Sequence, residues 1–522
     1  MNQPVDAAAL RSQGNALLSE GRVAEATACY ARACEIAPAD ATSWLNHAFG
    51  LLSMGDAGAA GQSLQRSIAL DGNSADAHFL MGQVAAQEGR LDDAQASFSR
   101  ALQLQPTLAV AALERGRALH GLERFDEALA SIDAALAIEP DWADAHHGRA
   151  KVLLELGRNE EALAASERVL SQHPGFADAL ADAGTASMRL GRFDAALALY
   201  ERGLANDPND ATLRWNRGLA LLTLGRMAEG WREYEWRWQA TVMRDALPQF
   251  THTHPKWTGE PLAAKTLLVH AEQGLGDTLH FVRFIPMLVR MAGRVVLRVP
   301  APIVTLCARI DPGCTVIADG SALPAFDLHC PLLGLPAVLG TTLDSIPAPD
   351  AYLRSDPARR AQWQARLGQR TGPRVGLVWS GGTLHKNDAN RSMALATLLQ
   401  GIPDGCELVS LQREVRDRDL PALQRAGVVH LGESLQSFDD TAALVDCVDV
   451  VVSVDTSVAH LAGGMGKPLV ILLPHVPDWR WLVGRSDSPW YRSALLMRQE
   501  ADCAWEPVMP GLKAQLADRL NL

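Results

Sequence analysis

A polar segment near the C-terminal end of the chain, Asp455–Ser457, has the residue types and the setting of an anion-binding site. It directly follows the apolar run Val450–Val454, which is too short for a helix and predicts a buried parallel strand. A short helix is expected over Val458–Met465, and a second apolar strand over Leu469–Leu473. The helix N-terminus, with its unbonded N–H groups and positive dipole end, is therefore expected at the carboxyl edge of a parallel sheet, where phosphates bind. An ordinary capped helix, with Asp455 as its N-cap, is the alternative interpretation.

Two further polar segments follow predicted strands and are expected at the same edge. A glycine turn, Ser380–Gly382, follows the predicted strand Arg374–Trp379 and precedes several cationic side chains. Such positive charge suits a leaving phosphate, and a solvated loop is the alternative. Gln412 follows another predicted strand, and His460, one turn inside its helix, either contacts the ligand or packs in the core. The candidate phosphate-binding residues are Ser380, Gly381, Lys386, Arg391, Gln412, Asp455, Thr456, Ser457, Val458 and His460, with additional charge from Lys467.

A third glycine-bearing turn, Glu272–Asp277, links the predicted strand Lys265–Ala271 to an amphipathic helix expected over Thr278–Met291. Asp277 lies beside Gly276, where an acceptor hydroxyl can approach the carboxylate. Asp277 either takes the proton of such a group or merely caps the following helix. The other residues of this candidate acceptor-side loop are Gln273, Gly274, Gly276 and His280. The residues that could act as the base instead are His270, Glu272 and His280.

Length and composition limit the class of protein. The chain has 522 residues, which indicates roughly two to four domains, and 48% of them are hydrophobic, as in an ordinary globular protein. A net charge of −12 without a long basic run argues against a nucleic-acid partner. The N-terminus does not resemble a secretory signal, no apolar run reaches the roughly 18 residues of a transmembrane helix, and the eight cysteines are scattered. We therefore expect a cytoplasmic protein with reduced thiols and no transmembrane segment.

The first half of the chain repeats with a period of 34 residues. Each unit carries, in a constant phase, a glycine where two helices approach, a small residue in the second helix and often a large one four positions later. The phased residues include Gly14, Gly82, Gly116, Gly184 and Gly218, then Ala26, Ala60, Ala94, Ala128, Ala162 and Ala196, and then Tyr30, Phe98, Tyr200 and Tyr234. This pattern resembles the tetratricopeptide repeat over about residues 7–240, with six regular units and a degenerate seventh at Ala211–Arg237. The resemblance implies a superhelix whose groove binds a partner protein; a spacer or dimerisation arm, and hence a homo-oligomer, is the alternative.

An aromatic segment, Trp231–Trp238, ends the array, and its tryptophans alternate with charged residues. We expect this segment to cap the last repeat and to pack against the next domain, because its two glutamates disfavour a nucleic-acid platform. The expected domains are the repeat array at 1–240, a linker at 241–262, an N-terminal α/β lobe at 263–355 and a C-terminal α/β lobe at 373–522, with a polar connector between the lobes.

Two α/β lobes with ligand-binding edges facing one cleft have the architecture of the nucleotide-sugar glycosyltransferases called GT-B. The predicted fold class is thus α + α/β: an all-α tetratricopeptide superhelix followed by a GT-B fold of two Rossmann-like lobes. The absence of a G-x-G-x-x-G fingerprint and of a P-loop argues against dehydrogenases and ATPases. GLGDTLHF at 274–281 resembles the G-D-x-L loop of the family-nine, heptosyltransferase-like GT-B enzymes. DTSVAHLAGGMGKP at 455–468 resembles their D-[ST]-x-x-x-H-x-A-x-x-x-G-x-P element.

The resemblance covers most of residues 263–490 and implies inverting, metal-independent sugar transfer. The C-terminal lobe would bind the nucleotide-sugar co-substrate, no other cofactor would be needed, and Asp277 corresponds to the loop aspartate proposed as general base in that family. The fusion to repeats departs from the lipopolysaccharide heptosyltransferases and is similar to bacterial repeat-plus-transferase proteins, among them flagellin glycosyltransferases. We therefore expect transfer to Ser or Thr hydroxyls of a protein held by the repeats, with flagellin as the first acceptor to test. A lipid-linked or polysaccharide acceptor and a non-catalytic repeat scaffold are the alternatives.

Overall fold

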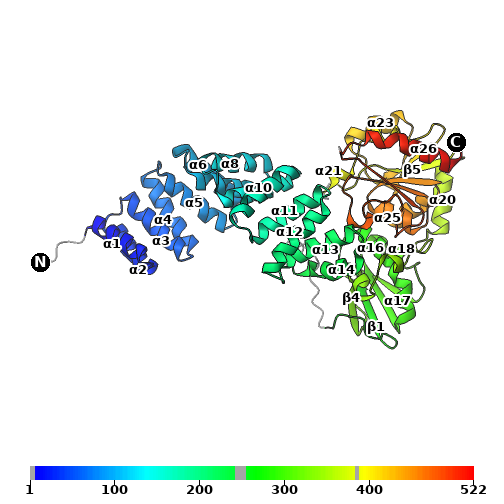
Figure 1. Ribbon diagram of the computed structural model, residues 1–522, viewed down its shortest axis with the longest axis horizontal. Helices are drawn as coiled ribbons and strands as arrows, with labels where there is room; N and C mark the ends of the chain where they lie inside the picture. Colours follow the sequence, from blue (N-terminus) through cyan, green and yellow to red (C-terminus); the bar gives the residue numbers. More distant parts are fainter. Residues whose placement is uncertain (1–5, 241–253, 383–386, 502) are drawn as a thin grey trace. The chain divides into compact units, whose positions relative to one another are not determined.

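The chain forms two compact units, Met1–Leu190 and Gly191–Leu522, and the computed structural model describes residues 6–240, 254–382, 387–501 and 503–522. The first unit consists of helices in antiparallel pairs joined by short turns (Figure 1), which confirms the predicted tetratricopeptide superhelix. Its helices are α1 Ala7–Ser19, α2 Val23–Ile36, α3 Ala41–Ser53, α4 Ala57–Leu70, α5 Ala75–Gln87, α6 Leu91–Leu104, α7 Ala109–Gly121, α8 Phe125–Ile138, α9 Ala143–Glu155, α10 Asn159–Gln172 and α11 Ala177–Arg189.

The phased glycines and aromatic residues of the array pack against each other as the repeat pattern predicts. A Cβ atom on Gly14 would lie 2.4 Å from Cε1 of Tyr30, and one on Gly82 would lie 2.5 Å from Cε1 of Phe98. Only glycine therefore lets the first helix of these units approach the large side chain of the second. The phased alanines of the second helices, such as Ala94, are fully buried, because the helices pack closely there as well.

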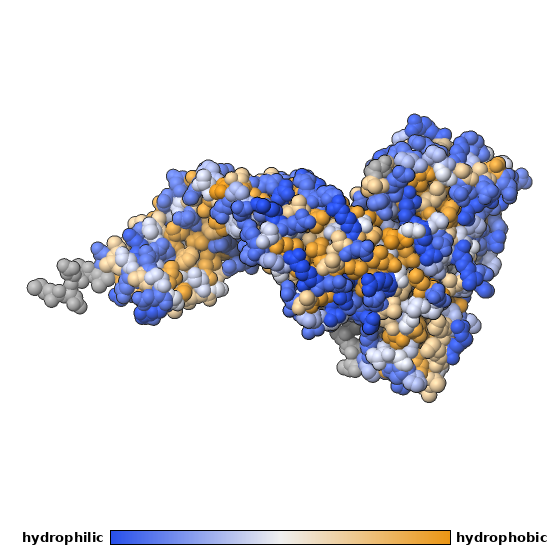
Figure 2. All heavy atoms as spheres, in the orientation of Figure 1, coloured by the Kyte–Doolittle hydropathy of each residue, from blue (hydrophilic) through white to orange (hydrophobic). Residues whose placement is uncertain are grey.

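Apolar side chains also lie among polar ones on the visible surface of the N-terminal repeats (Figure 2). The exposed large apolar residues of the first two repeats are Ile36, Phe49, Met54 and Leu70. Single exposed apolar residues of this kind are ordinary on protein surfaces. Among the residues that the structure describes, no helix is both long and apolar enough to cross a membrane.

The second unit begins with the last helices of the repeat pattern. These are α12 Phe193–Asn206, α13 Ala211–Thr223, α14 Met227–Tyr234 and the 3-10 turn η1 Glu235–Trp238. The second helix of each regular repeat has 14 residues, whereas α14 has eight and then tightens into η1. Most of the linker predicted at 241–262 lies outside the described residues.

Two fully parallel sheets follow in the second unit. The four-stranded sheet has the order β3-β2-β1-β4, and the six-stranded sheet has the order β10-β9-β8-β5-β6-β7. The first sheet contains β1 Thr266–His270, β2 Arg294–Val299, β3 Cys314–Ala318 and β4 Leu328–Pro331. The second contains β5 Arg374–Val378, β6 Glu407–Ser410, β7 Val429–His430, β8 Val450–Val454, β9 Leu469–Leu473 and β10 Ala494–Arg498. The α/β region predicted for the second half is therefore present.

Helices and 3-10 turns cover both sheets. Those of the first sheet are α16 Leu275–Phe281, η2 Val282–Phe284, α17 Ile285–Met291, η3 Ala301–Ile303, α18 Val304–Cys307, η4 Leu332–Gly334, α19 Leu335–Val338 and η5 Leu343–Ser345. Those of the second region are α20 Pro357–Leu367, α21 Asp388–Arg391, α22 Leu395–Leu399, η6 Asp417–Asp419, α23 Leu420–Arg425, η7 Gly432–Ser434, α24 Phe438–Asp446, α25 Ser457–Gly464, η8 Trp479–Trp481, η9 Glu506–Val508 and α26 Met509–Leu520.

One expectation about a helix was wrong. The single helix predicted over Thr278–Met291 begins earlier, at Leu275, and the 3-10 turn η2 divides it into α16 and α17. Pro286, at the start of α17, lacks the N–H that would continue the helix and its ring crowds the preceding turn. The connector between the lobes forms α20, which packs against α24 and whose Arg359 pairs with Asp440 at 2.6 Å.

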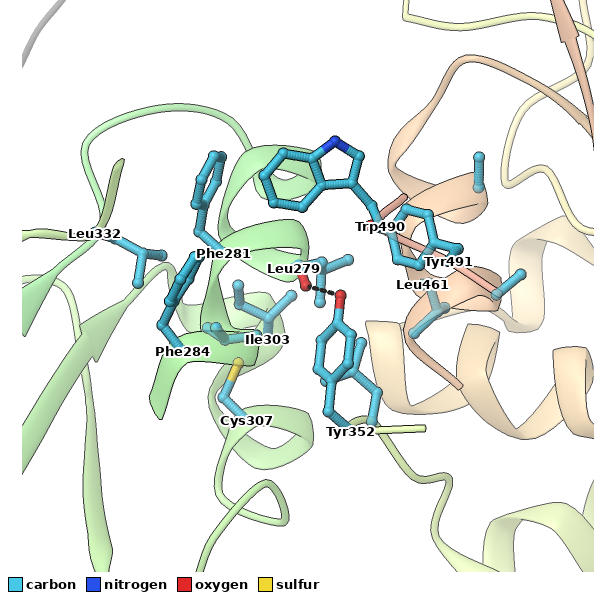
Figure 3. Packing of buried hydrophobic residues seen from close by; sticks show 14 of the residues in the cluster. Leu279, Phe281, Phe284, Ile303, Cys307, Leu332, Tyr352, Leu461, Trp490 and Tyr491 are labelled. Carbon is cyan, nitrogen blue, oxygen red and sulfur yellow. Dashed lines mark hydrogen bonds between the residues drawn. The ribbon is translucent and has the colours of Figure 1, made fainter. Parts of the chain in front are cut away.

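One continuous apolar core joins the end of the repeat array to both sheets. Trp231 of α14 makes edge-to-face contacts with Phe281, Trp479 and Trp490, at ring-centroid distances of 6.3, 5.3 and 6.5 Å. Figure 3 shows Phe281 on the side of the first lobe facing Trp490 of the second. These contacts confirm the prediction that the aromatic segment packs against the next domain. The large rings have little exposed area, so the contact buries much apolar surface.

Candidate functional site

A cavity of about 530 Å³ lies at the carboxyl edge of the six-stranded sheet. The loops after β5, β6 and β8 and the start of α24 form most of it, and Leu275 and Pro302 of the first lobe complete it. Six of the predicted phosphate-binding residues line this cavity: Ser380, Gly381, Gln412, Thr456, Ser457 and Val458. The structure therefore brings together three segments that the sequence placed separately at strand ends.

The start of α25 presents backbone donors to the cavity. Thr456 occupies the N-cap position in an extended conformation, and its side chain makes no capping hydrogen bond. The first N–H groups of a helix have no acceptor within the helix, so those of Ser457 and Val458 are available to a ligand. Asp455 precedes the cap, and the alternative interpretation of Asp455 as N-cap was wrong by one residue.

Gln412 holds the glycine turn after β5 in place. Its Oε1 accepts hydrogen bonds from the backbone N–H groups of Trp379 and Ser380, at 2.7 and 3.0 Å. Its Nε2 donates to Ser380 Oγ at 3.1 Å. Gln412 therefore lines the cavity as part of its frame, and the N–H of Gly381 donates to Ser392 Oγ at 3.0 Å.

Two cations on the cavity, Arg416 and Arg413, were missed by sequence reasoning. The guanidinium of Arg416 donates to the carbonyl oxygen of Gly381 at 3.1 Å and pairs with Asp388. Arg413, also on the cavity, is exposed and its guanidinium has no partner among the described residues. Both follow β6 by a few residues, as Gln412 does, and that shared position at a strand end was the available signal. Arg413 thus offers the cavity a cationic group, whereas the charge of Arg416 is offset by Asp388 and the carboxylate of Glu414 lies on the same wall.

Two of the predicted cations, Arg391 and Lys467, do not line the cavity. Arg391 donates from Nη1 to the carbonyl oxygen of Asp455 at 3.0 Å, so it fixes the loop before α25. Lys386 lies outside the described residues. The expectation for Lys467 was wrong: this residue precedes β9 at the amino edge of the sheet, and its Nζ donates to the carbonyl oxygen of Asp446 at 3.4 Å.

Asp277 lies on α16 beside the cavity and does not line it. Its Oδ2 accepts the backbone N–H of Gly274, the N-cap of α16, at 3.0 Å, and its Oδ1 pairs with Arg480 of the second lobe. Burial alone would lower the pKa of Arg480, but the carboxylates of Asp478 and Asp277 outweigh it and raise that pKa, so the cation is permanent. The Asp277 side chain is 23% exposed and can still be approached from solvent.

Gly276 allows α16 of the first lobe to lie directly against α25 of the second. A Cβ atom on Gly276 would lie 3.1 Å from Cδ2 of His460 and 3.4 Å from Cα of Ser457. This contact places the turn Glu272–Asp277 next to the turn Thr456–Val458. Gly276 therefore has a packing role, and of the predicted acceptor-side loop only the adjoining Leu275 reaches the cavity.

Two predicted histidines belong to the buried contact between the lobes. His280 and His460 lie with their Nδ1 atoms 2.8 and 2.9 Å from the hydroxyl of Tyr491. Burial disfavours the charged imidazolium and lowers the pKa of both histidines well below the usual value, with nearby arginines adding to the effect. His460 also stacks on Trp481 with ring centroids 5.2 Å apart, so it packs and does not line the cavity.

The other candidate bases are enclosed by protein. His270 is fully buried with its Nε2 3.1 Å from Nδ1 of His329. Glu272 is paired with Arg237 at 2.7 Å. Burial raises the pKa of Glu272 to about 7, although the positive charge of Arg237 acts to lower it. Asp455, which belongs to the predicted phosphate site and not to the candidate bases, is also partly buried. Burial and the charge of Asp478 raise the pKa of Asp455 to about 6. Of the bases proposed from the acceptor-side turn, Asp277 is thus the most accessible.

Comparisons with known proteins identify the repeats. Two family models described as tetratricopeptide repeat match residues 85–152 and 153–222, and residues 1–41 and 45–109. The N-terminal region therefore consists of tetratricopeptide repeats, which typically bind protein partners. No metal-binding group of three or more histidine, cysteine or carboxylate side chains occurs among the residues described.

One curated relative is Protein FlbA of Caulobacter vibrioides, which is 30% identical over 318 residues. The match covers 56% of this chain, and the chain spans about half, 52%, of the length of that relative. Among solved structures, YrrB, a tetratricopeptide protein with an unusual peptide-binding site, is 24% identical over 35% of this chain and 95% of its own, with a TM-score of 0.33. PilW, a type IV pilus biogenesis factor, is 21% identical over 41% of this chain and 98% of its own, with a TM-score of 0.37.

Proposed function

We propose that this protein is a GT-B glycosyltransferase that moves a sugar from a nucleotide-sugar donor to a Ser or Thr hydroxyl of a protein held by its repeats. The observation that carries the proposal is the cavity at the carboxyl edge of the six-stranded sheet, where Ser380–Gly382, Thr456–Val458 and Arg416 converge beside the acceptor-side turn. Its volume of about 530 Å³ falls in the range of small-molecule sites, which is roughly 300–1,000 Å³.

The donor diphosphate would bind against the start of α25. Its negative charge would meet the N–H groups of Ser457 and Val458 and the guanidinium groups of Arg413 and Arg416. The same donors would stabilise the charge that grows on the leaving phosphate, which is the work that a metal performs in other transferases. The apolar side of the cavity, with Leu411, Leu435 and Phe438, suits the flat face of a nucleobase.

The acceptor hydroxyl would attack the anomeric carbon from the side of α16. Its proton would pass to Asp277, the bond from the sugar to the phosphate oxygen would break, and the nucleoside diphosphate would leave. Arg480 supports this role because its guanidinium pairs with Oδ1 of Asp277 and so orients the carboxylate. The short distance between α16 and α25 supports the proximity that direct transfer needs.

The proposal is tested first by nucleotide binding. The full-length protein is heated with UDP, GDP, ADP, CMP or TDP, and its unfolding temperature is compared with that of the free protein. A nucleotide present at about 100 times its dissociation constant adds about 2.7 kcal/mol to the stability of the folded state, which is readily detected. A shift with one nucleotide that is lost in Arg416→Ala supports the donor site. No shift with any of the five favours a repeat scaffold without catalysis.

The acceptor is tested second. With the nucleotide known, the matching sugar donor is incubated with candidate proteins, and glycosylated Ser or Thr residues are mapped by mass spectrometry. Flagellin is the first candidate, on the resemblance in layout to flagellin glycosyltransferases. Modification of a lipid-linked or polysaccharide acceptor instead would keep the enzyme class and change the acceptor.

A further inference from the structure

The seventh repeat has a charged residue, Arg237, at a position where the other repeats bury an uncharged one, and burying a charge costs folding free energy. The 34-residue phase aligns Arg237 with a small or apolar residue of most earlier units: Ala33, Ala101, Ala135, Val169 and Gly203. These residues are buried where the second helix packs against its neighbours. Arg237 is fully buried as well, and a buried guanidinium is stable only when a carboxylate compensates for its lost hydration.

Two carboxylates compensate for the burial of Arg237: Glu235 of η1 itself, whose Oε1 lies 2.6 Å from Nη1 of Arg237, and Glu272 of the acceptor-side turn. Nη2 of Arg237 donates to Oε1 of Glu272 at 2.7 Å, and both side chains have no exposed surface. The next residue of the turn is bonded too, because Nε2 of Gln273 donates to the hydroxyl of Tyr234 at 3.0 Å. Two consecutive residues of the turn are thus held by two residues of the last repeat.

The shortened helix of the last repeat explains how both bonds form. Where α14 ends at Tyr234, the chain continues as the 3-10 turn η1. In a 3-10 helix, side chains three residues apart project in nearly the same direction. Tyr234 and Arg237 are three residues apart, and the Arg237 guanidinium carbon lies 4.8 Å from the centre of the Tyr234 ring. Both side chains therefore meet the same turn.

The held turn leads directly to Asp277. Glu272 and Gln273 precede Gly274, whose N–H donates to Asp277 Oδ2 at 3.0 Å. A second path reaches Asp277 through Arg480, whose guanidinium carbon lies 4.2 Å from the centre of the Trp479 ring. Trp479 in turn packs edge-on against Trp231 of the last repeat. The last repeat thus contacts the supports of the Asp277 carboxylate from two sides.

We infer that the seventh repeat is a positioning element of the acceptor-side turn, with Tyr234 and Arg237 as the positioning residues that fix Glu272 and Gln273. The catalytic consequence rests on the proposed function, whereas the ordering of the turn does not. Neither Tyr234 nor Arg237 lines the cavity, so their effect passes through the turn. It follows that the transferase region includes the last repeat and does not begin at β1.

The test compares Tyr234→Phe with Tyr30→Phe in the full chain. Both changes remove only a hydroxyl from the same phased position of a repeat, but the Tyr30 hydroxyl bonds to Asn15 within the array, at 2.7 Å. Hydrogen exchange is measured for a peptide covering residues 272–279, where the N–H groups of Gly274 and Thr278 are hydrogen-bonded. We expect exchange in this peptide to rise about fivefold in Tyr234→Phe and to stay unchanged in Tyr30→Phe, because one hydrogen bond is lost at the turn.

Equal exchange in this peptide for wild type and Tyr234→Phe overturns the inference. Transfer kinetics add a second readout: kcat should fall about fivefold in Tyr234→Phe while the KM for the nucleotide-sugar stays unchanged, since the donor cavity is untouched. A fall in kcat equal to that in Tyr30→Phe also overturns the inference. If the wild-type protein transfers no sugar but the exchange difference is present, the positioning role stands and the proposed function fails.

Discussion

Replacing Ser457 with proline should remove one backbone N–H that is proposed to donate a hydrogen bond to the diphosphate, without disturbing the fold. Ser457 is the first residue of α25, where proline is well tolerated because the N–H at this position has no acceptor in the helix. The preceding Thr456 has φ −146° and ψ 171°, the extended conformation that a following proline favours. The replacement therefore deletes a cavity-facing N–H at almost no cost in folding free energy.

The size of the effect follows from the type of bond that is lost. A hydrogen bond to a charged group contributes about 1.5–3 kcal/mol, and each 1.4 kcal/mol changes a dissociation constant about tenfold. We therefore expect the Kd of the bound nucleoside diphosphate to rise about 10- to 150-fold in Ser457→Pro. Ser457→Ala is the matched control, since it removes the hydroxyl and keeps the N–H, and its Kd should change by less than about threefold.

Isothermal titration calorimetry with the nucleoside diphosphate that shifts the unfolding temperature most measures both Kd values. Unfolding temperatures of the free variants show whether each is folded as the wild type is. A Ser457→Pro protein with wild-type stability and wild-type affinity would refute the reasoning that the start of α25 binds the diphosphate. Equal losses in Ser457→Pro and Ser457→Ala would refute it as well, because the hydroxyl and not the N–H would then be the contact.

Three further predictions concern the acceptor-side turn. Asp277→Asn should lower kcat about 10²- to 10⁴-fold while nucleotide affinity changes little, and steady-state kinetics with normal turnover would remove Asp277 as the base. Gly276→Ala should destabilise the second unit by about 1–3 kcal/mol in urea unfolding, because its Cβ would lie 3.1 Å from His460. Gly382→Ala, whose Cβ would meet none of the described residues within 4 Å, should have little effect. Glu272 has a folded pKa raised to about 7 by burial, so its contribution to stability is complete below pH 4.5 and is lost progressively as the pH rises from 4.5 through about 7. Urea unfolding at pH 5 and pH 8 should show this loss, about 2 kcal/mol, in the wild type and not in Glu272→Gln; equal pH dependence in the two proteins would contradict it.

Local patterns in the sequence predicted much of the architecture. The 34-residue phase placed Gly82 where two helices approach closely, and in the structure a Cβ at Gly82 would collide with Phe98 of the second helix. The apolar run Val450–Val454, the polar turn after it and the strand Leu469–Leu473 occur as predicted, within one residue. These features depend on residues near one another in the chain, so periodicity and capping preferences suffice to find them.

The composition of the cavity depended on information that one sequence does not contain. Strand order decides which loops meet, and β8 pairs with β5 on one side and β9 on the other, which joins the turns after β5 and β8. Phe438 and Arg416 entered the cavity because their segments lie beside those turns. Arg391 was predicted beside the phosphate and instead contacts the Asp455 carbonyl, and of the two roles left open for His460 the structure has packing, against Tyr491, because side-chain direction is set by packing.

The sequence by itself determined the repeat array, the parallel α/β elements and the polar turns at their strand ends. Only the tertiary structure decided that Asp277 pairs with Arg480, 203 residues away, and that Arg237 is buried against Glu272. The physical reason is the sequence distance over which each interaction acts. Backbone conformation and apolar periodicity are governed by neighbours along the chain, whereas the partner of a buried charge is whichever opposite charge the packing of distant segments brings within a few ångströms.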